Sequence, residues 1–405
     1  MAGKRIVLLR SNPVEPDPPV EKVAATLRAE GYEVTILAWD RSASYTERTE
    51  TSSVGVKTVR FGIPAEYGGG WKRNLFPLLT FQRRLWNRLN RYADEIDAVH
   101  AFDLDTGFTA ARFARQRRKR FVYHVLDYYA DSHALPKMLG KFVKREENKV
   151  ISSADVTILC TEKRREQIAG ARVKKLVVIH NTPIHSADGE DADILQKEGG
   201  RDATNHEDRL KIAYVGILAG GRLLPELLQV VAENRELELH VGGFGGLEGT
   251  VKRYAETYGN IFWYGKLPYG ETLALERACD VMTAIYDPSV PNHRYAAPNK
   301  FYEALLLGKP LIMARGTGFD EIPEKEGIGV GIEYGAEGLR TGLRALNARR
   351  AEFGEIGKRA RALYEREYSW RIMSARLLEA YEGLWKEESI CKREKRTEIR
   401  PLSAS

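Results

Sequence analysis

Short apolar runs alternate with longer stretches of mixed polarity through the first half of the chain. This alternation is typical of a parallel β-sheet wrapped by helices. The predicted strands are Arg5–Leu9, Glu33–Ala38, Val56–Phe61, Ala98–Phe102, Phe121–Leu126, Val156–Cys160 and Leu176–Ile179. The predicted helices are Val20–Glu30, Leu78–Tyr92, Thr106–Arg115 and Leu139–Ser152. Gly31 follows the first helix, where a C-cap glycine belongs.

The alternation stops at residues 186–209, which are polar and acidic and predict a linker or insertion. It then resumes. The predicted strands are Lys211–Gly216, Leu237–Val241, Ile261–Tyr264, Val281–Ile285 and Leu311–Ala314. The predicted helices are Leu223–Glu233, Leu247–Tyr258, Glu271–Ala278, Asn299–Leu307 and Ala336–Asn347. The pattern stays helical from Arg349 to Trp385, with Ser369 as a candidate N-cap, and residues 387–405 lack apolar periodicity and predict disorder.

These patterns predict two doubly wound, Rossmann-like α/β domains, because 405 residues are many for one hydrophobic core. The first domain is expected over 1–185, the second over 210–367, and a last helix over 368–386. No apolar run reaches the ~18–20 residues that span a bilayer, and no secretion signal is recognisable, which favours a cytoplasmic protein. The three cysteines are isolated and match no metal-binding spacing, as expected in a reducing compartment.

Candidate ligand-binding chemistry is concentrated between Tyr295 and Pro310. Pro298 and Asn299 open a helix that carries Glu303 about one turn in, and an apolar strand follows. Backbone N–H groups at a helix start favour anions. A carboxylate one turn further along could hold a ribose diol. The segment therefore predicts a site for a nucleotide diphosphate.

Glycines follow the first two strands of the second domain. Gly216 precedes a loop with Gly220, Gly221 and Arg222, and Gly243 lies after the next strand. A strand, a glycine-rich loop and a helix that starts near an arginine can cradle phosphate. The spacing is not G-x-G-x-x-G, however, and glycines that serve only a turn beside a solvated arginine explain the residues equally well.

The order of these features resembles the nucleotide-sugar half of the retaining glycosyltransferases of family 4, which have the GT-B fold. The resemblance extends to Val177-Val-Ile-His-Asn181 before the linker and to Glu367-Tyr-Ser-Trp370 before the last helix. It implies two domains that face each other across a cleft. The implied activity is hexosyltransferase-like. A sugar passes from a nucleotide-diphosphate sugar to a glycan or lipid-linked acceptor, in polysaccharide or glycolipid synthesis, with no metal and no other cofactor.

The resemblance also implies roles for single residues in donor binding. Arg222 falls where the family places a basic residue on the donor diphosphate, and Glu303 falls on the second glutamate of an E-x7-E pattern, which holds the ribose. The other implied donor-site residues are Gly216, Gly243, Asn299 and Lys300. The chain departs from the family at Tyr295, where the first glutamate is expected, and at Ile217, where a second basic residue is usual. Arg294, His293 or Lys300 are candidate substitutes.

Two alternative functions stay open beside glycosyl transfer. A sugar-nucleotide epimerase would use the same architecture but needs acid and base groups around the sugar. A catalytically silent scaffold is the other alternative, because the first glutamate of the pattern is missing.

In the first domain, polar residues follow two predicted strands. Ligands of open α/β sheets bind at the carboxyl ends of the strands, so Asp103 and Asp127 are the candidate catalytic residues. Asp105 precedes a helix and is interpreted as a helix N-cap. Leu126 stands where many relatives have a histidine, and His124 shares its strand face.

His100 is interpreted as a core residue. Because the sequence offers no clear nucleophile, the resemblance implies front-face attack, in which the departing phosphate helps to remove the acceptor proton. Arg222 and helix N–H groups would stabilise that phosphate. Asn181 and the last helix are the candidate hinge of a domain closure that excludes water.

Basic residues are concentrated in the first half of the chain. Residues 1–185 hold 32 Lys/Arg against 21 Asp/Glu, a net charge of +11 within the total of +7. The segment 71–92 has six Lys/Arg and no acidic residue, with one apolar helical stripe (Leu78, Phe81, Leu85, Leu89 and Tyr92) and one arginine stripe (Arg84, Arg88 and Arg91). A core-packed helix with a solvated face explains it. Peripheral docking on an anionic membrane, at its inner face, is the sharper hypothesis. No nucleic-acid motif accompanies the charge, so no nucleic acid is expected as a partner.

Overall fold

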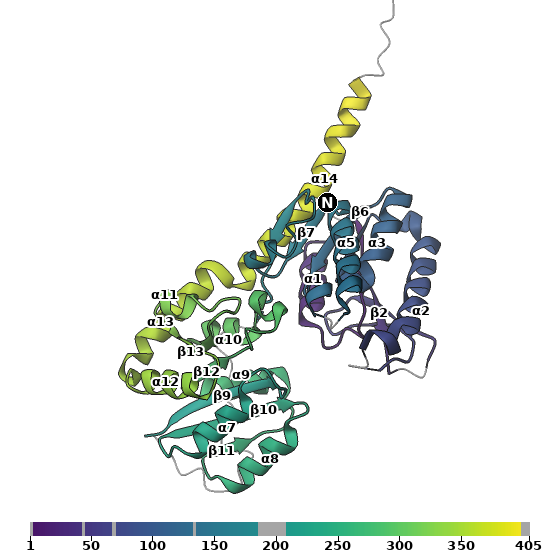
Figure 1. Cartoon of the computed structure of the whole chain (residues 1–405). Helices are drawn as coiled ribbons and strands as arrows, with labels where there is room; N and C mark the ends of the chain where they lie inside the picture. Colours follow the sequence, from purple (N-terminus) through teal and green to yellow (C-terminus); the bar gives the residue numbers. More distant parts are fainter. Residues whose placement is uncertain (1–2, 43–44, 67–69, 133–134, 185–207, 398–405) are drawn as a thin grey trace, which may run out of the picture. The chain divides into compact units, whose positions relative to one another are not determined.

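The computed structural model describes residues 3–42, 45–66, 70–132, 135–184 and 208–397 and divides into two compact units (Figure 1). The first unit comprises Met1–Asn181 and Arg371–Ser405, and the second comprises Thr182–Trp370. Each contains a largely parallel sheet with helices on both faces, so the predicted doubly wound α/β class is confirmed. Of the predicted linker at 186–209, residues up to 207 lie outside the described ranges.

In its described part, the first unit has an eight-stranded sheet in the order β3-β4-β2-β1-β5-β6-β7-β8. Its strands are β1 Arg5–Arg10, β2 Glu33–Asp40, β3 Glu47–Thr51, β4 Lys57–Gly62, β5 Ala98–Phe102, β6 Arg120–Val125, β7 Val156–Leu159 and β8 Leu176–Val178. Neighbours pair in parallel except at the β3 edge, which is antiparallel to β4. The order of connection reverses between β1 and β5, the position where such sheets bind ligands.

The helices of the first unit cover both faces of this sheet. They are α1 Pro18–Ala29, α2 Gly70–Arg91, α3 Leu104–Arg117, α4 Tyr129–Ser132, α5 Lys137–Ser153 and the long C-terminal α14, Trp370–Thr397. Helices α2, α3 and α5 share one hydrophobic core, which includes Phe81, Phe113 and Ile151. Helix α14 is anchored to β8, where the Arg376 guanidinium donates to the Val178 carbonyl at 3.1 Å. Gly31 has φ of 89°, which confirms it as the glycine that ends α1.

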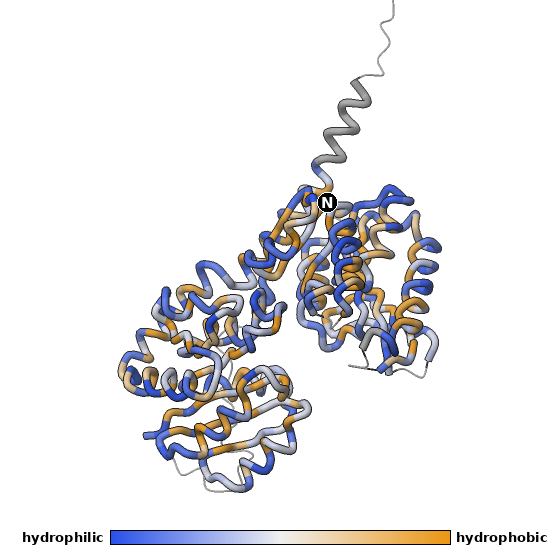
Figure 2. Tube along the Cα trace, viewed as in Figure 1, coloured by the Kyte–Doolittle hydropathy of each residue, from blue (hydrophilic) through white to orange (hydrophobic). Residues whose placement is uncertain are grey.

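The second unit has the strand order β11-β10-β9-β12-β13-β14, all parallel. Its strands are β9 Leu210–Ile217, β10 Leu237–Phe244, β11 Ile261–Trp263, β12 Val281–Ala284, β13 Leu311–Ala314 and β14 Gly329–Ile332. Its helices are α7 Leu224–Ala232, α8 Glu248–Thr257, α9 Tyr269–Ala278, α10 Asn299–Leu307, α11 Ile322–Lys325, α12 Ala336–Asn347 and α13 Phe353–Leu363. Apolar strand residues dominate the sheet (Figure 2), with α7 and α12 packed on one face and α10 and α13 on the other. The switch point lies between β9 and β12.

Two sequence expectations about the C-terminal segment are corrected. Disorder was expected from residue 387, but the backbone of α14 is helical to Thr397, because the segment is rich in Glu, Lys and Arg, which favour helices without an apolar stripe. Ser369 directly precedes α14, as a cap should. Its hydroxyl is buried and makes no hydrogen bond to any described residue, so it does not act as a side-chain cap.

Candidate functional site

Two glycines lie next to each other near the carboxyl edge of the second sheet. Gly216 on β9 and Gly243 on β10 pair with each other across the strands, and both have positive φ, 144° and 140°. A Cβ added to Gly243 would overlap the carbonyl oxygen of Gly216. Both were predicted as ligand-side glycines. For Gly243 the close approach of two backbones already requires glycine, so no ligand is needed to explain it.

Arg222 lies in the loop between β9 and α7, next to the switch point. Its guanidinium stacks over the ring of Tyr286, which follows β12, at 4.3 Å from the ring centroid. The backbone N–H of Asp287 donates to the Gly221 carbonyl at 2.8 Å, which ties the loop to the end of β12. Stacking of this kind positions a guanidinium while leaving its N–H groups able to bind an anion in the ring plane.

Lys300 and Glu303 form one ionic cluster with a third residue, Glu276 of α9. The Lys300 Nζ lies 2.6 Å from Glu276 Oε1 and 2.8 Å from Glu303 Oε2. Both glutamates are buried. Burial opposes the charge on Lys300, but the two carboxylates outweigh it and raise its pKa. The Lys300 Cε lies 3.9 Å from the Cβ position of Gly216, so this cluster adjoins the carboxyl end of β9.

Sequence reasoning missed Glu276. A signal was available, because α9 buries Thr272, Leu273, Leu275 and Glu276, and a glutamate among buried helix positions needs a partner. What the sequence did not show is that this partner is Lys300, 24 residues further along.

The remaining predicted donor residues surround this cluster. Asn299 is exposed as the first residue of α10, after the N-cap Pro298, and the first turn carries no acidic residue. The Tyr269 hydroxyl hydrogen-bonds to Glu303, and burial together with this carboxylate raises the pKa of Tyr269. Tyr295 ends a 3₁₀ turn, Pro291–Tyr295, and is half-buried. The structure therefore brings Gly216, Arg222, Lys300 and Glu303 to one edge of the sheet.

His293, a candidate substitute for the missing glutamate, contacts Tyr286, the residue on which Arg222 stacks. Its ring packs edge-on against Tyr286 with centroids 5.0 Å apart, and its Nδ1 lies 2.9 Å from the Asp287 carbonyl. Because a carbonyl only accepts, Nδ1 carries the hydrogen and Nε2 is the ring nitrogen that remains to accept a bond.

Asp103 follows β5 at the switch point of the first sheet, and its carboxylate is already engaged. It pairs with Arg10 Nη1 at 2.5 Å and accepts from the backbone N–H of Leu126 at 2.8 Å and of Asp127 at 3.1 Å. Its backbone has φ of 59° and ψ of 171°, which is unusual for a residue with a side chain. Asp103 therefore organises the end of β6.

Asp127 differs from Asp103 in its exposure. Its side chain is 58% exposed and pairs with the buried Arg164 at 3.1 Å. Arg164 also donates to Cys160 Sγ and to Gln167 Oε1, which holds its guanidinium in place. Of the two predicted carboxylates, Asp127 is the one that can meet a ligand.

The N-cap interpretation of Asp105 is wrong. Helix α3 begins at Leu104, and Asp103 occupies the N-cap position, because its carbonyl accepts from Gly107 N at 3.0 Å. Asp105 lies in the first turn and accepts from the Ser11 hydroxyl at 2.9 Å.

The core interpretation of His100 is confirmed. It is fully buried, its Nδ1 lies 2.8 Å from the Tyr381 hydroxyl, and burial lowers the pKa of His100 to about 3. His124 is buried beside it, with 3.4 Å between His100 Nε2 and His124 Nδ1, and burial also lowers the pKa of His124.

The apolar stripe of 71–92 packs inward at its centre, as the core-packed interpretation holds. Phe81, Leu85 and Leu89 are fully buried. Arg84 donates to the carbonyls of Thr46 and Gly62, and Arg88 pairs with Glu47 at 3.1 Å, so these two arginines serve the domain itself.

The amino-terminal part of α2 has a different character. Leu75, Phe76 and Leu79 are exposed there, Phe76 by 77%. On α5, Met138 is 80% and Phe142 52% exposed. A groove of about 590 Å³ runs between α2, α3 and α5, and most of its charged lining residues are basic: Arg83, Arg112, Arg115 and Lys149, with Glu146. An adjoining hollow carries Lys141, Lys144 and Arg145.

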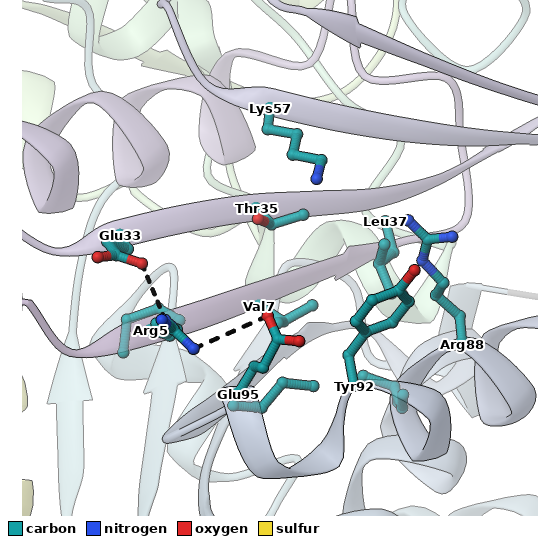
Figure 3. Close-up of a pocket in the computed structure, with 12 residues that line it drawn as sticks. Arg5, Val7, Glu33, Thr35, Leu37, Lys57, Arg88, Tyr92 and Glu95 are labelled. Carbon is teal, nitrogen blue, oxygen red and sulfur yellow. Dashed lines mark hydrogen bonds and ion pairs between the residues drawn. The ribbon is translucent and has the colours of Figure 1, made fainter.

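A second pocket of about 290 Å³ lies at the amino ends of β1, β2 and β4 (Figure 3). Arg5 spans it, paired with Glu33 at 2.9 Å and Glu95 at 3.8 Å, and Tyr92 from the end of α2 closes one side. It is at the opposite edge of the sheet from the strand ends where α/β folds bind ligands, and Arg5 already has two carboxylate partners.

Over the described ranges, every helix is too short or too polar to cross a bilayer. In those same ranges, no three His, Cys, Asp or Glu side chains gather as a metal-binding group.

Residues 18–182 match the family described as glycosyl transferase 4-like domain. No curated protein matches the chain significantly. Among solved structures, sucrose-phosphate synthase from Thermosynechococcus elongatus matches with a TM-score of 0.75 at 15% identity, covering 95% of this chain and 100% of that one. Anabaena HepE, in complex with UDP and glucose, gives 0.68 at 15% identity, with 93% and 99% covered. WaaG, involved in lipopolysaccharide biosynthesis, gives 0.64 at 14%, with 92% and 98% covered. The fold is the GT-B fold that the resemblance implied.

Proposed function

We propose that this chain, whose residues 18–182 match a glycosyl transferase 4-like domain and whose fold is GT-B, is a retaining, metal-independent glycosyltransferase. Its donor is a nucleotide-diphosphate sugar, and its acceptor is a glycan or a lipid-linked molecule. The observation that carries the proposal is the meeting of Arg222, Lys300 and Glu303 at the carboxyl edge of the second sheet.

Donor binding follows from the charges at this edge. A diphosphate needs cations and N–H donors, which Arg222, Lys300 and the first turn of α10 at Asn299 provide. A ribose diol needs an acceptor, and the Glu303 carboxylate lies within the same cluster. HepE, one of the structural neighbours, was solved with UDP and glucose, a ligand of this chemical class.

A mechanism that retains the anomeric configuration without a covalent enzyme intermediate agrees with the contacts of Asp103 in the first unit. Asp103 is held by Arg10 and two backbone N–H groups, so it is not available as a nucleophile. In this proposal Asp127 positions the acceptor, Asp103 positions Asp127 through its backbone N–H, and the leaving phosphate takes the acceptor proton. The protein then contributes charge stabilisation by Arg222 and Lys300 and the orientation of the reactants.

Calorimetry with UDP, GDP and ADP tests this function. The wild type should bind at least one of them. Glu303→Gln should weaken binding about tenfold or more through loss of a charged hydrogen-bond acceptor, whereas Glu271→Gln, on an exposed position of α9, should leave it unchanged. If the wild type binds none of the three nucleotides, the scaffold alternative is favoured. Conversion of the donor sugar without an acceptor would favour the epimerase.

A lipid-linked acceptor is favoured by the exposed face of α2 and α5. Apolar side chains such as Phe76, Leu79 and Met138 stand among basic residues there, the combination that binds anionic bilayers. On this basis we propose that the enzyme docks at the inner face of a membrane. The proposed membrane-docking face is the amino-terminal half of 71–92 together with α5. Arg84 and Arg88, in the other half, are not part of it because they bind groups within the domain.

Liposome co-sedimentation tests the docking. The wild type should bind vesicles containing phosphatidylglycerol at low salt and much less at high salt. Phe76→Ser with Leu79→Ser should reduce binding severalfold, while Tyr258→Ser, an exposed apolar residue of the second unit, should not. Equal sedimentation of all three proteins would refute docking through this face.

A further inference from the structure

Glu276 is a buried carboxyl at the donor edge that the proposed mechanism leaves without a task. It is fully buried on α9, and its Oε1 lies 2.6 Å from the Lys300 Nζ. Its second oxygen, Oε2, has no hydrogen-bond partner among the described residues. A buried carboxylate oxygen without a donor is unfavourable, because burial removes its hydration and nothing replaces it.

The cluster has one positive group and two acidic groups. If Glu276 and Glu303 were both ionised, Lys300 would leave a net charge of −1 in a buried site intended for an anionic diphosphate. Two carboxyls that share one counter-charge avoid this when one of them keeps its proton. Protonation of one glutamate makes the cluster neutral.

The contacts identify which glutamate holds the proton. Glu303 accepts from the Lys300 ammonium and also interacts with the Tyr269 hydroxyl, two bonds that favour its carboxylate form. Glu276 has Lys300 alone, and its Oε2 is the atom with room for a hydrogen. The charged groups that face Glu276 are Lys300 and Glu303 of α10, while Tyr269 and Cys279 lie near it as neutral groups. Burial, the largest influence, raises the pKa of Glu276, in agreement with this assignment.

We propose that Glu276 is a positioning residue that holds Lys300 at the donor-diphosphate site, and that binding of the donor completes the protonation of Glu276 Oε2 by taking a proton from solvent wherever this carboxyl is still ionised. This rests on the proposed function of the site. The diphosphate brings at least two negative charges next to Lys300, which makes a second buried carboxylate there still less favourable. The protonated carboxyl keeps its Oε1 as an acceptor for Lys300, and the incoming anion replaces the lost carboxylate as counter-charge.

The geometry explains why a residue outside α10 is needed. Lys300 and Glu303 are three residues apart on one helix and can pair by themselves. Glu276 holds the same ammonium from a second helix, α9, while the Lys300 Cε lies 3.9 Å from the Cβ position of Gly216. Without it, the Lys300 ammonium would be held from α10 alone.

Calorimetry in two buffers of different ionisation enthalpy measures the proton directly. The probe is the tightest-binding of UDP, GDP and ADP, studied above about pH 7, where its terminal phosphate is already ionised. For the wild type we expect proton uptake that rises toward one per nucleotide as the pH increases, with affinity falling up to about tenfold per pH unit.

Variants separate the proton from the positioning. Glu276→Gln mimics the protonated carboxyl and should bind with no proton uptake and with nearly constant affinity over the same pH range. Glu276→Ala removes the acceptor for Lys300 and should bind about tenfold more weakly at every pH, while Glu271→Gln should behave as the wild type. A thermal melt of each variant confirms that it is folded.

Three outcomes would overturn the inference. Proton uptake that persists in Glu276→Gln would place the proton on another group. Nucleotide binding by the wild type without uptake would reject the proton on Glu276 and leave the proposed function intact. Absence of nucleotide binding by the wild type would reject both.

Discussion

The contacts of Asp103 predict a structural effect that separates it from a catalytic carboxylate. Its carboxylate and the Arg10 guanidinium are only 16% and 15% exposed, and they lie 2.5 Å apart. Asp103→Asn keeps an oxygen for the N–H groups of Leu126 and Asp127 but removes the charge. Asp103→Ala removes the acceptor as well.

The magnitudes follow from these contacts. Breaking a buried ion pair from one side destabilises by about 3–5 kcal/mol. Arg10 keeps Asp17 at 2.6 Å as a second carboxylate partner, so we expect a cost at or just below the lower end of this range, about 2–3 kcal/mol, for Asp103→Asn. Two backbone N–H groups without an acceptor add about 1 kcal/mol each, which gives about 4–5 kcal/mol for Asp103→Ala. Asp127→Asn, whose side chain is 58% exposed, should change the stability by less than about 1 kcal/mol.

Hydrogen exchange measured by mass spectrometry is the suitable assay, because a two-unit protein need not unfold in one step. Peptides that cover the end of β6 should exchange about 30- to 150-fold faster in Asp103→Asn, as 1.4 kcal/mol corresponds to a factor of ten. Peptides of the second unit should be unchanged. Wild-type exchange at β6 in both Asp103 variants, together with loss of sugar transfer, would refute this reasoning and assign Asp103 to the chemistry.

Three further predictions address other sites. Gly243→Ala should lower the thermal unfolding midpoint by several degrees, because at φ of 140° its Cβ would overlap the Gly216 carbonyl. The control Gly246→Ala, at a position with open space, should leave the midpoint nearly unchanged. Equal midpoints for the two variants would contradict the close approach of Gly243 to Gly216. Burial raises the pKa of Glu147 from 4.5 to about 8, so the folded state holds a proton that the unfolded chain releases, and stability should fall as pH rises through that window. Glu147→Gln should flatten this fall, by at most about 4 kcal/mol, when melting is followed from pH 5 to pH 8.5. Arg222→Ala should lower kcat/KM for the donor about 10- to 100-fold with an unchanged melting temperature. A variant with the wild-type kcat/KM would show that Arg222 does not bind the donor diphosphate.

Most of the parallel strands and most helices were predictable because burial on both faces gives such a strand a continuous apolar run, although the parallel edge strand β14 was not predicted. Ala98–Phe102, Asn299–Leu307 and Ala336–Asn347 have the predicted bounds. Edge strand β3, Glu47–Thr51, was not predicted. Its residues are polar on both faces, since it pairs with β4 alone and buries little. The hydrophobic pattern therefore shows no alternation that would predict a strand there.

Candidate residues were predictable when their signal is local. A helix start, a glycine after a strand and a carboxylate one turn further along are properties of adjacent residues, and they pointed to Arg222, Lys300 and Glu303. Partners are not local. The engagement of Asp103 by Arg10, 93 residues away, and of Lys300 by Glu276 depends on which strands and helices become neighbours.

By itself, the sequence determined the two α/β units, the strand edge proposed to bind the donor and the chemical type of the candidate donor residues. These follow from hydrophobic periodicity, glycine and the chemistry of single side chains. Only the tertiary structure decided that Gly243 is required by its neighbouring strand, that Asp103 is committed to holding β6, and that Glu276 shares Lys300 with Glu303. The physical reason is that burial and pairing set the charge of an acidic residue, and both arise only when distant segments pack together.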